Sequence, residues 1–155
     1  MAGNIDARLQ ELGLEIPEAA APVANYVAYV VTGNLCFTAG QVTLKDGAFE
    51  HQGKLGAEIS VDEGYQAARL CAINIIAQLK AACGGDLDRV KRIVKLVGFV
   101  NSTPDFVDQP KVVNGASDLM VEVFGDAGKH ARSAVSAASL PVGVAVEVEC
   151  VAELA

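Results

Sequence analysis

In the segment from Val144 to Val151, one set of alternate residues is wholly apolar, and the other set, Ala145, Glu147, Glu149 and Val151, carries two glutamates. The apolar set is Val144, Val146, Val148 and Cys150. Successive residues of a strand point to opposite faces, so the other set, which includes Glu147 and Glu149, would share the second face. This alternation predicts a strand that covers a core with one face and presents two carboxylates on the other. For Glu149 in particular, a solvated outer position is the simplest interpretation.

Helical signals mark two long segments upstream of this strand. Ser60-Val-Asp-Glu63 is a capping box, and Gly84-Gly85 is a helix stop, so we predict a helix from Val61 to Ala82. A second helix is predicted from Gln109 to Phe124, with Asp108 as a candidate cap and Pro110 in the first turn. A short amphipathic helix from Ile5 to Leu14 precedes both.

Strands are predicted around these helices from β-branched content and turn residues. Thr32-Gly33-Asn34 reads as a hairpin turn and Lys45-Asp46-Gly47 as a second turn. The predicted strands span residues 26–31, 35–42, 48–55, 90–101, 133–138 and 144–152. This order predicts an α+β fold with one sheet and two helices packed on one of its faces.

Length and composition narrow the classes of function that the chain could have. A chain of 155 residues fits one domain, and its 52% apolar content exceeds what one interior needs, which indicates association with another subunit. The net charge of -7 and the lack of a basic run argue against a broad nucleic-acid surface. We expect no membrane segment and no signal peptide. The four cysteines lack zinc spacing, so we expect buried free thiols and no metal.

Three residues outside the alternating strand could belong to a binding site. Arg132 could be a surface charge, a partner for Glu147 or an anchor for a carboxylate through its planar fork. Asn114, near the start of the second long helix, is either solvent-facing or a hydrogen-bonding group. Tyr26, expected to open the first strand, is either a half-buried aromatic or a pocket wall.

Several motifs together resemble the RidA/YjgF family of reactive-intermediate deaminases. The tail carries Ala131-Arg-Ser-Ala-Val135, then Leu140-Pro141, then the alternating strand with its two glutamates. Thr32-Gly-Asn34 with Thr38-Ala-Gly-Gln41 is similar to the opening hairpin of that family. Residues 98–106 are similar to its central strand and loop. The resemblance runs from about Tyr26 to Leu154, so we place the family-like domain at residues 23–155. Residues 1–22, a helix and a linker, look like the extension of a longer, endoribonuclease L-PSP-like subgroup.

The resemblance implies a fold, an assembly and an activity. The fold would be a chorismate-mutase-like (Bacillus type) mixed sheet, in a cytoplasmic homotrimer with clefts between subunits. The activity would be that of a 2-iminobutanoate/2-iminopropanoate-type deaminase, which hydrolyses enamines or imines to 2-keto acids and ammonia without a cofactor. Arg132 matches the family residue that grips the carboxylate, and Glu147 matches the one beside the attacking water. Tyr26, Gly40 and Asn114 match positions that line the substrate cleft.

Two positions depart from the family pattern. Ala39 stands where the deaminases often carry serine, and Ala134 stands where they often carry cysteine. The missing polar groups leave a second hypothesis open, a trimer that binds or senses small 2-keto or other carboxylic acids without turnover. A third hypothesis, ribonuclease activity, follows from the subgroup's usual label and is disfavoured by the acidic charge.

Overall fold

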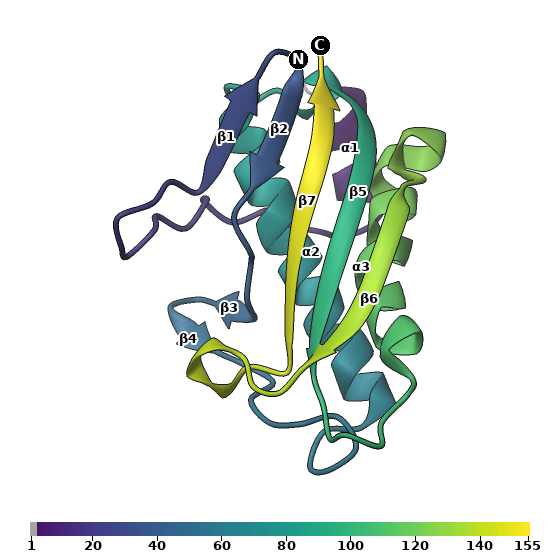
Figure 1. Ribbon diagram of the computed structural model, residues 1–155. Helices are drawn as coiled ribbons and strands as arrows, with labels where there is room; N and C mark the ends of the chain where they lie inside the picture. The colour runs from purple at the N-terminus through teal and green to yellow at the C-terminus, as the bar shows by residue number, and fades with distance from the viewer. Residues whose placement is uncertain (1–2) are drawn as a thin grey trace.

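The computed structural model describes residues 3–155. A five-stranded sheet forms one layer, and the long helices α2 and α3 lie together behind it in a second layer (Figure 1). The helices are α1 (Asn4–Glu11), α2 (Val61–Ala82) and α3 (Gln109–Phe124), with 3-10 turns at Leu87–Arg89, Gly125–Gly128 and Pro141–Gly143. The strands are β1 (Tyr29–Thr32), β2 (Leu35–Thr38), β3 (Leu44–Lys45), β4 (Ala48–Phe49), β5 (Val90–Asn101), β6 (Ala131–Ala137) and β7 (Val146–Leu154).

The strand order in the sheet is β1-β2-β7-β5-β6. Only the β5–β6 pair is parallel, so the sheet of five strands is mixed, as the family resemblance implies. The β3–β4 hairpin forms a separate small sheet. We expected a strand over residues 48–55, but β4 ends at Phe49, so the prediction is wrong beyond that residue. The chain leaves extended geometry there because His51 has a φ of 51°.

The two long helices have the predicted bounds because their local signals are specific. The Ser60 hydroxyl accepts a hydrogen bond from the Glu63 amide at the start of α2. Beyond its end, Gly84 and Gly85 take positive φ values, which glycine tolerates. Asp108 occupies the cap position of α3, but its side chain makes no cap bond and instead pairs with Lys111 at 3.3 Å.

The N-terminal helix α1 ends three residues earlier than predicted and packs against α3. Its first turn is capped from a distance, because the Asp88 carboxylate accepts hydrogen bonds from the amides of Asn4 and Ile5, at 2.9 and 2.8 Å. Leu9 is buried in the common core. The chain then runs without regular structure to β1, which starts at Tyr29, so the prediction that Tyr26 opens this strand is wrong.

The core fills the space between the sheet and the helices. Its largest fully buried side chains include Ile75, Leu79, Leu96, Leu119 and Met120. All four cysteines are free and buried, as the sequence predicts. Burial raises the pKa of Cys36 to about 11 and that of Cys150 to about 12, so these thiols stay protonated and unreactive at neutral pH.

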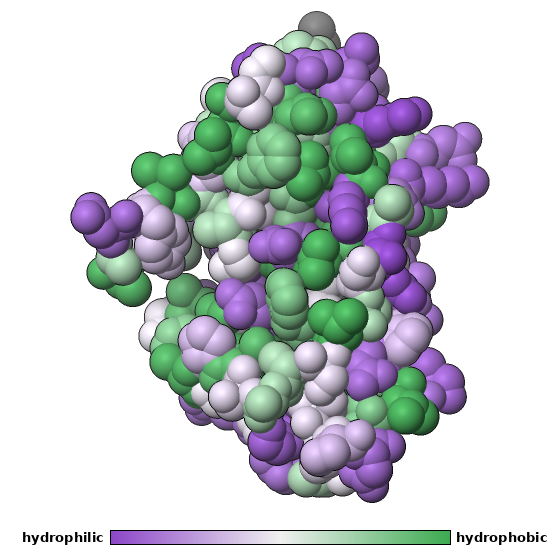
Figure 2. All heavy atoms as spheres, in the orientation of Figure 1, coloured by the Kyte–Doolittle hydropathy of each residue, from purple (hydrophilic) through white to green (hydrophobic). Residues whose placement is uncertain are grey.

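The other face of the sheet has no cover within the described chain (Figures 1 and 2). The strand register places Val30 opposite Phe37 and Phe37 opposite Val151 on this free face. Val30, Phe37 and Val135 are 52%, 42% and 45% exposed, although each is apolar. Among residues 3–155, no helix has the length and hydropathy needed to cross a bilayer.

Candidate functional site

Arg132 lies on the edge strand β6, on the side that faces α3. Its parallel pairing with Leu96, a fully buried residue, assigns it to the helix side of the sheet. Its Nη1 donates to Asn114 Oδ1 at 2.8 Å and to Ser117 Oγ at 3.2 Å, both on α3. The structure thus brings together two of the predicted site residues, Arg132 and Asn114, and identifies Asn114 as a hydrogen-bonding group.

A histidine extends this contact, and the sequence reasoning missed it. His130 Nδ1 lies 2.6 Å from the Gly128 carbonyl, which can only accept, so Nδ1 carries a proton. His130 Nε2 lies 2.9 Å from Ser117 Oγ. The hydroxyl of Ser117 accepts from Arg132, and its own hydrogen is free to point toward His130 Nε2. His130 lies just before β6, two residues from Arg132. In an extended chain that spacing places two side chains on the same side, and it was the signal that could have revealed His130.

The donors left on Arg132 define how it could hold a ligand. Both hydrogens of Nη1 are engaged by Asn114 and Ser117. Within residues 3–155, Nε and Nη2 have no hydrogen-bond partner. These two groups form one edge of the planar guanidinium and match the two oxygens of a carboxylate.

Glu147 lies on the free face of the sheet, as the alternation of the last strand predicts. It faces Gly40 so closely that a Cβ at that position would collide with Glu147 Oε1. Burial raises the pKa of the Glu147 carboxyl, and the nearby charge of Glu149 raises it further. A carboxylate with a raised pKa is better suited to accept a proton from water near neutral pH.

Gly40 and Tyr26 line a common cavity of about 160 Å³ beside β2. Ala39, one of the two positions that depart from the family pattern, lines it too. Tyr26 is 54% exposed and lies in the segment that extends from the body of the molecule ahead of β1 (Figure 1). Its side chain therefore belongs to a pocket wall and not to the core.

The candidate site residues form two groups that one chain does not bring together. Arg132 and Asn114 lie at the β6 edge on the helix side, whereas Glu147 and Gly40 lie around β7 and β2 on the free face. Strand β5 separates β6 from β7. Ala134 shares the face of Arg132, so each group carries one of the two alanines. In the described part of the chain, no cluster of three or more His, Cys, Asp and Glu side chains could hold a metal ion.

A family model described as "YjgF/chorismate_mutase-like, putative endoribonuclease" matches residues 6–154. The chain belongs to the YjgF/RidA family. It is 51% identical to protein TCP17 of Trypanosoma cruzi, over 99% of this chain and 96% of that protein. It is also 30% identical to a RutC family protein of Synechocystis, over 91% of this chain and 95% of that protein.

Two solved structures superimpose on this YjgF/RidA chain. A protein of unknown function from Agrobacterium tumefaciens is 45% identical and superimposes with a TM-score of 0.92, covering 97% of this chain and 92% of that chain. TdcF of E. coli, crystallised with bound serine, is 25% identical with a TM-score of 0.64, covering 89% and 94%. The YjgF/chorismate-mutase-like fold expected from the sequence is therefore confirmed.

Proposed function

We propose that this protein hydrolyses reactive 2-imino acids, with their enamine tautomers, to 2-keto acids and ammonia in a cleft between subunits. The observation that carries the proposal is the division of the site. The free edge of the Arg132 guanidinium suits a carboxylate, and Glu147 suits a water molecule, but they lie on opposite faces of one sheet. A second copy would supply the missing half.

We also propose that three copies assemble through the free sheet face. Apolar side chains on that face, including Val30, Phe37 and Val135, are about half exposed in the single chain. An uncovered apolar sheet face is typical of a subunit interface. Packing it against neighbours would bring the β6 edge of one copy toward the Gly40 and Glu147 region of the next, in a closed ring.

The reaction needs only binding and proton transfer. Arg132 holds the carboxylate of R–C(=NH2+)–COO⁻ through Nε and Nη2, which fixes the imine carbon. Glu147 takes a proton from water as the new C–O bond forms at that carbon. Glu147 then returns the proton to nitrogen and takes the proton of the new hydroxyl as the C=O bond forms and the C–N bond breaks. Ammonia leaves and takes that proton from Glu147, so the products are R–C(=O)–COO⁻ and ammonium.

A binding protein without turnover is the second candidate. Ala39 and Ala134 remove polar groups that could assist proton transfer, yet both leave the guanidinium edge of Arg132 free. The serine held by TdcF is a small molecule with a carboxylate, which fits either function. Ribonuclease activity has less support, because Glu147, Glu149 and Glu153 follow one strand of the free face and would repel phosphate.

The decisive experiment measures competition for an imine. An L-amino acid oxidase generates the 2-imino acid, and semicarbazide traps what the protein does not hydrolyse, so activity lowers the rate of semicarbazone formation. We expect Arg132→Ala and Glu147→Gln to abolish the effect, whereas Arg8→Ala, an exposed change on α1 away from the free sheet face, leaves it intact. Wild type that binds pyruvate without lowering semicarbazone formation would identify the binding protein instead.

Mixing the two inactive variants tests the position of the site. If each cleft takes Arg132 from one subunit and Glu147 from the next, random mixed trimers contain intact clefts. Refolding Arg132→Ala and Glu147→Gln together at equal amounts should then restore about a quarter of the wild-type activity. No recovery in mixed trimers, with the oligomer mass checked by light scattering, would contradict an intersubunit site.

A further inference from the structure

The cavity beside β2 has a mostly apolar lining. Its walls come from the linker ahead of β1, from the end of β2 and from the β3–β4 hairpin, and they include Pro22, Val23, Ala28, Val42, Leu44 and Phe49. The surface is hollowed below the extended linker on the side of the free sheet face (Figure 2). An engineered apolar cavity of about 150 Å³ binds benzene, so about 160 Å³ is enough for a branched aliphatic side chain.

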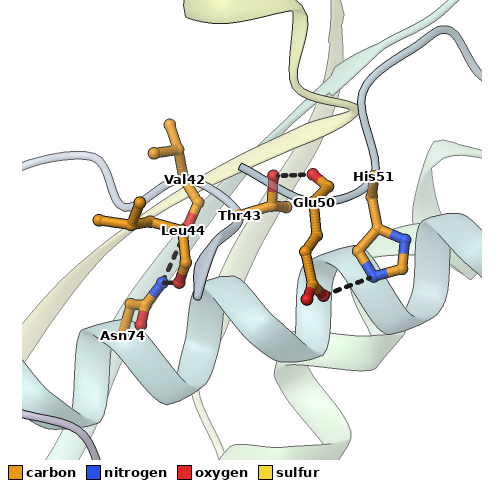
Figure 3. A network of polar contacts seen from close by, with 6 residues as sticks. All are labelled: Val42, Thr43, Leu44, Glu50, His51 and Asn74. Carbon is orange, nitrogen blue, oxygen red and sulfur yellow. Dashed lines mark hydrogen bonds and ion pairs between the residues drawn. The ribbon is translucent and has the colours of Figure 1, made fainter. Parts of the chain in front are cut away.

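Side-chain amides on α2 hold two of these walls in place. Gln78 is 1% exposed, and its Nε2 donates to the Ala20 carbonyl at 2.9 Å, which fastens the linker to α2. On the other side, Asn74 Nδ2 donates to the carbonyls of Val42 and Leu44, each at 2.9 Å (Figure 3). The Thr43 hydroxyl, bonded to the Glu50 carbonyl, ties the hairpin further. The walls are therefore preformed.

Three polar side chains line the cavity, Asn74, Gln41 and the uncharged Tyr26. Asn74 is bound to two carbonyls, and Gln41 Nε2 donates to the Ala39 carbonyl at 3.1 Å. No Asp, Glu, Lys or Arg side chain is among the lining residues that the structure describes. A charged ligand group would lose its hydration there without gaining a partner of opposite charge, whereas an apolar group would gain from burial.

The cavity adjoins the proposed reacting centre through one residue. Gly40 lines it and also lies against the Glu147 carboxylate. A side chain attached to an imine carbon held beside Glu147 could thus reach the apolar walls of the cavity. We propose that this cavity receives the substrate side chain and selects 2-imino acids with branched aliphatic side chains. The linker over residues 20–23 is then part of the specificity site. The proposal rests on the function proposed above.

The competition assay tests the selection with different amino acids. We expect the wild-type kcat/KM for the leucine-derived imine to exceed that for the alanine-derived imine by about tenfold or more, and the glutamate-derived imine to be the poorest. Ala28→Phe and Ala21→Phe, which fill the cavity from two walls, should lower the leucine-to-alanine ratio by about tenfold. Ala24→Phe, in the same linker but outside the lining, is the matched control and should retain the ratio.

The outcomes separate the two proposals. Hydrolysis of the alanine-derived imine without a preference for leucine would overturn the selection and leave the proposed function standing. An unchanged ratio in both filled variants, with their melting temperatures confirming a folded protein, would also overturn it. Failure of the wild type on every imine would overturn the proposed function, and the selection with it.

Discussion

Replacing Arg132 by lysine retains the positive charge but changes the number and geometry of donors. Two hydrogens of Arg132 Nη1 serve Asn114 and Ser117, and the edge formed by Nε and Nη2 is free for a ligand. A lysine has three N–H donors on one nitrogen. If two of them satisfy Asn114 and Ser117, one remains, and the bidentate contact to a carboxylate is lost.

The expected loss follows from that count. A hydrogen bond to a charged group contributes about 1.5–3 kcal/mol, and 1.4 kcal/mol is a factor of about ten, so Arg132→Lys should lower kcat/KM for a 2-imino acid at least tenfold. The competition assay measures it, and Arg8→Lys, at an exposed arginine on α1, serves as the control. An Arg132→Lys protein within about threefold of wild type would refute the bidentate contact, because a point charge would then suffice.

Other predictions concern Glu147 and the N-terminal helix. Gly40→Ala should displace the flexible Glu147 carboxylate and reduce kcat strongly, with a melting temperature near that of wild type. Since burial and Glu149 raise the pKa of Glu147, activity should fall as pH drops through that raised pKa, and Glu149→Gln should move the acidic limb of the kcat/KM profile to lower pH. The raised pKa costs stability as pH rises through it, so Glu147→Gln should raise the melting temperature at pH 8 and not at pH 4. Asp88→Ala should cost about 1 kcal/mol in urea unfolding, because α1 loses its cap.

The sequence predicted most of the fold where a local signal was strong. The capping box fixed the start of α2, and the β-branched run fixed β5. The prediction failed at β1, because residues 26–28 have strand-like composition but lie outside the sheet. Composition cannot reveal this, since pairing with Leu35–Thr38 starts only at Tyr29 and depends on the hairpin register.

Prediction of the candidate site was also limited by pairing between distant segments, which composition does not show. Alternation correctly assigned Glu147 to the face opposite the core. It could not show that Arg132 turns toward α3, because that depends on the parallel register between β5 and β6, which joins segments about 35 residues apart. Asn114 and Ser117, one helical turn apart, meet Arg132 only through this tertiary pairing.

The bond between Gln78 and the Ala20 carbonyl has a consequence for how such a protein could diversify. It anchors a surface segment that carries none of the groups proposed for the chemistry. Substitutions in that segment, or in the buried amide that holds it, could alter which molecules are accepted while Arg132 and Glu147 stay fixed. Loops tolerate sequence change better than the elements they connect. Related chains could therefore acquire different substrate preferences through their N-terminal linkers, with the reacting groups inherited unchanged.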